Sequence, residues 1–275
     1  LLISGGFVFS YVATLMLTKL RGLESVAIYN VAVLVVQIMM VLTVVPSVTT
    51  PIAAGLWHEG QSDAIGGLAS FIERVMLAAG VVLAVFLVLA SELVIRVLFG
   101  AGFGLAAMPV LILGSGVPIL VVAQSFVNLL SAVERPDLAG QVTVVAVVAN
   151  VALNAVCILL WGAVGAALAT VLAHVILASL ARAMLAGYVD IPAGPKGVRR
   201  MAWVGGAGVA AAGLVRFAQP GPGGALAAVV AIVAAFAWFC RRGLVQLGHE
   251  GCSHFFNGRR WSAHNAKEGR KMQDE

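Results

Sequence analysis

Residues 138–181 read LAGQVTVVAVVANVALNAVCILLWGAVGAALATVLAHVILASLA, 44 residues without a charge between Asp137 and Arg182. As one helix this stretch would be about 66 Å long, more than twice the ~30 Å hydrocarbon core of a bilayer. It must therefore cross a membrane twice and reverse direction inside the run. Residues 161–165 (WGAVG) lie near its middle and predict the turn. The stretch indicates a polytopic membrane protein.

The composition of the whole chain agrees with this interpretation. Hydrophobic residues make up 61% of the 275 residues and charged residues 11%, against roughly a quarter charged in an ordinary soluble domain. The net charge of +5 is dispersed between apolar runs or gathered in one tail, which excludes a nucleic-acid partner. The three cysteines, Cys157, Cys240 and Cys252, are odd in number and predict no disulfide framework.

The apolar runs predict an all-α protein with about eight transmembrane helices, each near the ~20 residues needed to cross a bilayer. The chain opens at Leu1, without Met, directly in such a run. We therefore expect a piece of a longer protein, with a processed start as the alternative. The expected spans are residues 2–18, 28–50, 74–95, 106–131, 138–160, 164–186, 201–217 and 222–240.

Three parts follow from these spans. Residues 1–187 are expected to form a six-helix transmembrane lobe, and residues 188–243 two additional transmembrane helices. Residues 244–275 are polar and basic, which predicts a disordered tail. Lys and Arg number thirteen on the side of the tail and four on the other side, so the tail is expected to be cytoplasmic in a multi-pass plasma-membrane protein.

Residues 57–74 form the longest polar interruption between spans. Asp63 is suited to cap a helix, and Ile65, Leu68 and Ile72 follow at helical spacing. This pattern predicts an amphipathic helix lying on the cytoplasmic face of the membrane. A plain loop leading into the third span is the alternative.

No catalytic motif occurs in the chain. Paired carboxylates, a nucleophile elbow, a phosphate loop and a metal-binding helix motif are all missing from the sequence. The tail residues His249, Cys252, His254 and His264 do not have the spacing of a zinc site. We therefore expect no enzyme activity, no cofactor and no metal.

Polar side chains within the expected spans are the candidate functional residues, because such groups are costly in hydrocarbon unless paired or hydrated. They recur at helical spacings that place several on shared faces. One interpretation is a shared polar cavity. The other is hydrogen bonding between helices, worth about 0.6 kcal/mol on average, with the histidine either packed and neutral or linked to proton transfer. The candidates are Asn30, Gln37, Gln124, Asn128, Asn150, Asn154 and His174.

Prolines and small residues add local expectations. Pro46 and Pro51 are expected to bend or end the second span. Pro109 and Pro118 are expected to do the same in the fourth span. Bent helices are typical of alternating-access transporters. The small-xxx-small spacings within residues 162–169 predict close packing of helix backbones.

Several motifs together resemble one family. The Asn150–Asn154 segment (NVALN), followed by GAVGAALAT at residues 162–170, resembles the N-x-x-L-N … G-x-x-G-A-A-x-A-T stretch of polysaccharide flippases. These belong to the superfamily that includes lipid II flippases and multidrug extruders. Three further segments occur in the family's order, with Phe103 in place of Tyr and Glu134 in place of Gly. They are WHEG after Pro51, VLFGAGF at residues 97–103 and SAVERP at residues 131–136.

The resemblance covers residues 1–187 and implies the second of two six-helix lobes around a central cavity, followed by two extra helices. The first lobe would be missing, so transport would need the N-terminal lobe or a partner chain. The implied function is translocation of lipid-linked oligosaccharide or polysaccharide precursors across the membrane by alternating access, with the seven polar residues as cavity candidates. In the family, charges that hold the lipid phosphates often lie in the missing part, and their positions cannot be assigned here.

Three other functions stay open. A cation-coupled multidrug extruder of the same superfamily would need a buried acid, for which Glu92 is the candidate. A truncated, non-transporting membrane protein is the second. A membrane-embedded glycosyltransferase is the third, and the lack of an acidic motif at either interface disfavours it.

Overall fold

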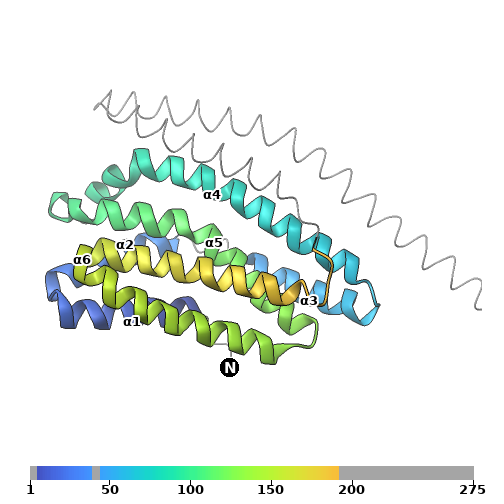
Figure 1. Ribbon diagram of the computed structural model, residues 1–275. Coiled ribbons are helices and arrows are strands. Elements are labelled where there is room, and N and C mark those ends of the chain that lie inside the picture. Colours follow the sequence, from blue (N-terminus) through green and yellow to red (C-terminus); the bar gives the residue numbers. More distant parts are fainter. Residues whose placement is uncertain (1–4, 39–43, 192–275) are drawn as a thin grey trace, which may run out of the picture. The chain divides into compact units, whose positions relative to one another are not determined.

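The computed structural model of the chain describes residues 5–38 and 44–191 (Figure 1). The chain divides into two compact units, Leu1–Val233 and Ala234–Glu275, and all described residues belong to the first. They form α-helices and one 3-10 helix, without any strand among them. The expected spans at 201–217 and 222–240 and the tail at 244–275 lie outside the described residues.

Seven helices follow one another along the described part of the chain. The central one, α5, contacts α2, α3, α4 and α6, and one of its faces is almost entirely buried. Figure 1 shows the longer helices running alongside one another in a bundle. The elements are α1 (Gly5–Leu20), α2 (Leu23–Ile38), α3 (Val44–His58), α4 (Ser62–Phe99), η2 (Ala101–Ala106), α5 (Ala107–Ala132) and α6 (Pro136–Leu185).

The long uncharged run folds as a helical hairpin, as predicted. Within α6 the backbone of Gly162 leaves the helix at φ 56° and ψ −127°, a conformation that glycine adopts far more easily than other residues. The two arms on either side of this break lie side by side (Figure 1). A Cβ on Gly165 would collide with the backbone carbonyl of Cys157. The absence of a side chain at this position therefore lets the two arms meet directly after the turn.

The expected polytopic all-α fold is confirmed. Within the described residues, three helical segments are long and apolar enough to cross a membrane, namely Ser62–Leu87, Gly102–Ala132 and Pro136–Leu185. Two shorter apolar segments, Tyr11–Leu20 and Leu23–Gln37, accompany them. The second expected span, 28–50, falls on α2 and the start of α3, with residues 39–43 between them outside the described set.

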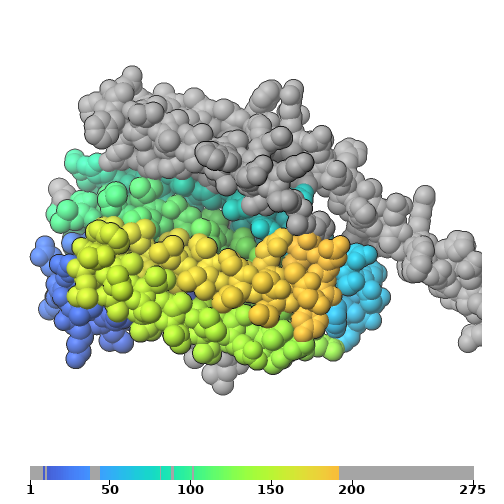
Figure 2. Space-filling model, viewed as in Figure 1, coloured from blue at the N-terminus to red at the C-terminus, as the bar shows by residue number. Residues whose placement is uncertain are grey.

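The surface of the hairpin is apolar where it is exposed. Its first arm presents a series of aliphatic side chains and one indole that are each more than 40% exposed. Figure 2 shows both arms of α6, in yellow-green to orange, on one face of the molecule. Such a surface is costly in water and suited to lipid. The residues are Val144, Val145, Val148, Val151, Val156, Leu159, Leu160 and Trp161.

The prediction of a separate amphipathic helix on the membrane face is wrong. A helix does begin at Ser62, but it continues without a break to Phe99 as α4. Ile65 and Ala69 are fully buried and Ile72 is 2% exposed, and all three belong to the protein core. Helical periodicity identifies an apolar face but not what covers it, and here the protein covers it.

The prolines differ in their effects. Pro109 lies in the first turn of α5, where its missing N–H is not needed. Pro118 lies inside α5, and its ring packs against Gly80 of α4. The expectation that Pro51 ends its helix is wrong, because Pro51 lies inside α3, which continues to His58. The hydroxyl of Thr50 donates a hydrogen bond of 2.6 Å back to the carbonyl of Pro46 in the same helix.

One departure from the resembled family has a local consequence. Glu134 stands where the family has Gly, and its φ is 61°, the left-handed region that favours glycine. The turn closes with a hydrogen bond from the Arg135 N–H to the carbonyl of Leu130 at 2.9 Å. The α5–α6 turn thus keeps the geometry that explains the family's glycine.

Candidate functional site

A polar stripe on α2 is the first candidate site. Glu24, Ala27, Asn30, Leu34 and Gln37 are all exposed, and their spacing of three or four residues places them on one side of the helix. Two of the predicted site residues, Asn30 and Gln37, therefore lie on a single exposed face. The opposite side of α2 is buried through Tyr29, Ala32, Val35 and Val36.

The stripe continues onto α1. The hydroxyl of Thr14 donates to the Asn30 amide oxygen at 3.4 Å, at an exposed position. Tyr11 and Leu15, each 67% exposed, lie on the same side of α1 as Thr14. The two helices therefore share one face that mixes amide, hydroxyl and apolar groups with one carboxylate, that of Glu24. We call this face, made of Tyr11, Thr14, Leu15 and the five α2 residues, the α1–α2 face.

Gln124 and Asn128 form a pair on α5. The Gln124 amide donates to the Asn128 oxygen at 2.9 Å, and both side chains are half-buried. The spacing of four residues that was used to predict a shared face is therefore the spacing of a direct hydrogen bond.

Asn150 and Asn154 form a second pair in the first arm of α6, and both are completely buried. The Asn154 amide donates to the side-chain and backbone oxygens of Asn150, each at 3.0 Å. The Nδ2 of Asn150 and the Oδ1 of Asn154 have no hydrogen-bond partner among the described residues. A buried amide atom without a partner costs about 1–3 kcal/mol. Binding of a polar molecule such as water next to these two atoms would therefore be favourable.

His174 lies in the second arm of α6 and is 4% exposed. Its Nδ1 is 2.8 Å from the carbonyl of Thr170, and its ring meets that of Phe9 edge to face at 4.8 Å. The hydroxyl groups of Thr170 and Tyr29 are 3.4 Å apart. His174 is thus packed against α1 and its own helix, at a place where α2 also reaches the hairpin.

The hairpin brings buried polar residues to matching depths. Asn154 and Thr170 each lie eight residues from Gly162, and Asn150 and His174 each lie twelve. At 1.5 Å per residue these levels are about 12 and 18 Å from the turn. The predicted polar residues therefore occupy three places: the exposed α1–α2 face, the α5 pair and the interior of the hairpin. Their joint function in one cavity stays a prediction.

Sequence reasoning missed the residues that tie the elements together. The guanidinium of Arg21, between α1 and α2, donates to the carbonyls of Ile158 (3.1 Å) and Leu159 at the end of the first hairpin arm. These carbonyls lack helical donors because the helix stops at Gly162. The predicted turn implied that the carbonyls before it need a hydrogen-bond donor from elsewhere in the chain. Nothing in the sequence identified Arg21 as that donor.

The described residues contain no group of three or more His, Cys, Asp or Glu side chains that could hold a metal ion. The arrangement offers amide and hydroxyl groups and the imidazole of His174, all of which can bind by hydrogen bonding. Its chemistry suits recognition of a polar molecule.

Comparison with known proteins supports the fold. No protein-family model matches the chain. An uncharacterized membrane protein of Methanocaldococcus jannaschii is 28% identical over 179 residues, which are 63% of this chain and 35% of that protein. The chain thus aligns with about a third of that relative's length.

Two solved structures share the architecture. The lipid II flippase MurJ, in an inward closed conformation, matches with a TM-score of 0.59 at 14% identity, over 87% of this chain and 53% of the flippase. An outward-facing MATE family multidrug transporter of the MOP superfamily matches with a TM-score of 0.55 at 19% identity, over 78% of this chain and 51% of the transporter. The chain therefore spans about half the length of each. It is a membrane protein with the fold of one half of a flippase-like transporter.

Proposed function

We propose that this chain is the C-terminal half of a transporter that moves lipid-linked oligosaccharide or polysaccharide precursors across the plasma membrane. The second lobe would come from an N-terminal part of the same protein or from a partner chain. Transport would proceed by alternating access, in which a polar cavity between the lobes opens first to one side and then to the other. The observation that carries this proposal is the α1–α2 face.

The α1–α2 face is poorly suited to lipid. Asn30 and Gln37 are exposed on α2, whose residues after Ser25 are otherwise mostly apolar, and amide groups in hydrocarbon are costly unless paired or hydrated. The lipid-suited surface of α6 carries no exposed amide between Val144 and Trp161. A face with amides is therefore expected to border water, a substrate or another lobe, and the length match to half of two solved transporters supports the same conclusion.

The chemistry of the face suits a sugar. Asn30, Gln37 and Thr14 offer both donors and acceptors without fixed charge, which matches the hydroxyl groups of a glycan.

A cation-coupled multidrug extruder is the second candidate, and the match to the multidrug transporter favours it. Its acid would be Glu92, which lies near the end of α4 and forms an ion pair with Arg96 at 2.6 Å. An acid already paired in its own helix is less suited to binding a cation in a central cavity, so we rank this function second.

The orientation is part of the proposal. The loops at residues 58–62 and 132–136 and the segment after α6 lie at one end of the bundle, which we call the inner end (Figure 1). The positive-inside rule applied to the whole sequence predicts that this end and the tail are cytoplasmic.

The test uses the complete protein, including its second lobe, in cells that depend on it for glycan export. Asn30→Leu combined with Gln37→Leu is expected to lower export at least about tenfold, a loss equivalent to roughly 1.4 kcal/mol. Val148→Ala, at an exposed aliphatic residue of the α6 surface that is suited to lipid, is the control for a change on an exposed surface. Unchanged export in the double variant at normal protein levels would rule out the α1–α2 face as the cavity wall.

Two further readouts separate the alternatives. Asn150→Leu combined with Asn154→Leu tests the buried pair in the same export assay, and unchanged export would remove it from the site. Expulsion of a fluorescent cation from vesicles, with glycan export absent, would favour the extruder.

A further inference from the structure

The short segment that follows α6 is packed against the inner end of the bundle. Its amides continue in turn hydrogen bonds, with the N–H groups of Tyr188 and Val189 both donating to the carbonyl of Leu185 at 2.9 and 3.1 Å. The side chains of Val189 and Ile191 are 3% and 6% exposed. Residues 186–191, which we call the strap, are therefore part of the core at this end.

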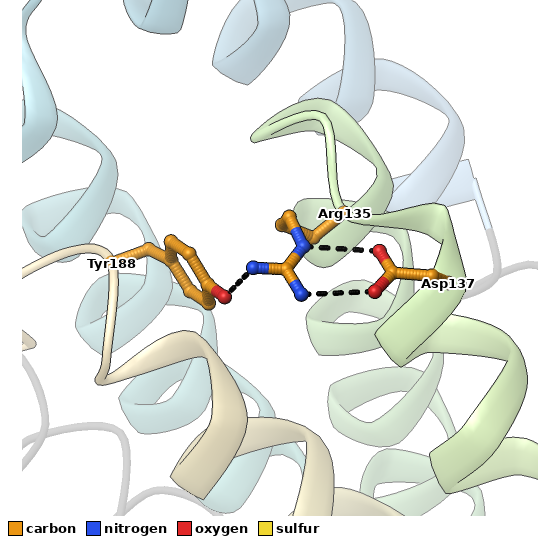
Figure 3. A network of polar contacts seen from close by, with 3 residues as sticks. All are labelled: Arg135, Asp137 and Tyr188. Atoms are coloured by element: carbon orange, nitrogen blue, oxygen red, sulfur yellow. Dashed lines mark hydrogen bonds and ion pairs between the residues drawn. The ribbon is translucent and has the colours of Figure 1, made fainter.

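The strap contacts the α5–α6 turn through Tyr188. The Tyr188 hydroxyl accepts a hydrogen bond from the Arg135 guanidinium, whose centre also lies 4.9 Å from the centroid of the Tyr188 ring (Figure 3). Arg135 in turn donates twice to the Asp137 carboxylate, at 3.0 and 2.9 Å. The hydrogen bond from Arg135 to Asp137 raises the pKa of Arg135.

The strap contacts α4 at a glycine. A Cβ on Gly66 would collide with the backbone carbonyl of Asp190, whereas one on the next residue, Gly67, would meet nothing within 4 Å. About two turns further along α4, Glu73 pairs with Arg182 of α6 at 3.2 Å. Both side chains of this pair are partly buried, with exposures of 18% and 32%. Two separate contacts thus join α4 to the end of α6.

These contacts connect three elements that are distant in sequence. Arg135 follows α5, Glu73 and Gly66 belong to α4, and the strap extends α6. We propose that the strap holds the inner ends of α4, α5 and α6 together as one body. Rearrangement of the lobe is then confined to the other helices. This inference does not depend on what the protein transports.

The test measures hydrogen exchange of the purified chain in detergent, peptide by peptide. Gly66→Ala is expected to displace the strap and to raise amide exchange in residues 186–191 at least about tenfold. Gly67→Ala is the matched control, because it makes the same chemical change one residue away in open space. Equal exchange of the strap in the two variants would overturn the proposal.

A second variant tests the coupling between the strap and α4. It also keeps the proposal testable if Gly66→Ala fails to fold. Tyr188→Ala is expected to raise amide exchange in the strap. It is also expected to raise exchange in residues 62–73 of α4, because the strap would transmit the effect from Tyr188 to that helix. Tyr11→Ala, at an exposed tyrosine of α1, should leave both regions unchanged. An effect of Tyr188→Ala that stops at the strap would show a local role only and would contradict the joining of the three helices.

Discussion

The amides of α2 and those of the α6 hairpin look alike in the sequence but differ in the structure. Asn30 and Gln37 are exposed, and the Thr14 hydroxyl reaches Asn30 from the neighbouring helix. Asn150 and Asn154 are completely buried and bonded to each other. Both pairs fall on one helix side by spacing alone. The difference teaches that spacing finds a shared face, whereas only the packed fold shows whether that face is inside the bundle or open to a partner.

The two regions should therefore respond differently to substitution. Changes inside the hairpin are expected to lower the stability of the fold, because they act on close backbone contacts and buried polar groups. Changes on the α1–α2 face are expected to affect function and to leave stability nearly unchanged.

The largest effect is expected at the hairpin turn. Gly165→Val places side-chain atoms where the Cys157 carbonyl lies, and overpacking at a backbone contact should cost about 3 kcal/mol or more. The yield of monodisperse chain in detergent and its thermal unfolding measure this. Gly140→Val, in the same α6 but in open space, is the control. Similar yields of the two variants would show that the arms can separate without loss.

The next effect is expected at the buried asparagines. Asn154→Leu removes the donor to the Asn150 oxygens and leaves a buried acceptor without a partner, at a cost of about 2 kcal/mol. Adding Asn150→Leu should cost less than the sum of the two single changes, because the double variant leaves fewer unpaired side-chain atoms. Unfolding of all three variants measures the coupling. Strict additivity would show that the pair is not a structural unit.

A smaller effect is expected at the tip of the hairpin. Arg21→Gln removes the guanidinium from the carbonyls of Ile158 and Leu159, which should lower stability by roughly 0.5–1 kcal/mol at this exposed position. Lys19→Gln changes the same charge two residues away and should have no measurable effect. If the two variants unfold alike, the contribution of Arg21 is only its charge.

The smallest effect on stability is expected on the α1–α2 face. Asn30→Leu and Gln37→Leu should each change the free energy of unfolding by less than about 0.5 kcal/mol, since both side chains are exposed. Thermal unfolding in detergent measures it. A loss as large as that of Asn154→Leu would abolish the distinction between the two regions.

The sequence predicted most of the transmembrane architecture. A 44-residue uncharged run forces a reversal, and Gly162 and Gly165 lie near its middle, where a turn divides it into two spans of suitable length. The fourth expected span, 106–131, agrees closely with α5, Ala107–Ala132. Length and hydrophobicity decide these features, and both are local properties of the chain.

Contacts between distant segments were not predictable in this way. The apolar stripe of Ile65 and Ile72 was assigned to the membrane surface, but it faces α-helical neighbours that periodicity cannot identify. Arg135 and Arg182 were counted only for membrane orientation, although they contact Tyr188 and Glu73, 53 and 109 residues away. Nothing in the sequence pairs a cation with one distant partner over another.

The length of α4 has a practical consequence. Its 38 residues extend about 57 Å, roughly 27 Å more than the hydrocarbon thickness of a bilayer. Because the whole of α4 cannot lie in the hydrocarbon, one of its ends is expected to extend beyond it, and at the Ser62 end the helix remains packed against the bundle and the strap. An antibody fragment that binds the Glu59–Asp63 corner would therefore be held rigidly relative to the bundle. Such a fragment could serve as a fiducial mark for aligning particles of this helical protein in electron cryo-microscopy.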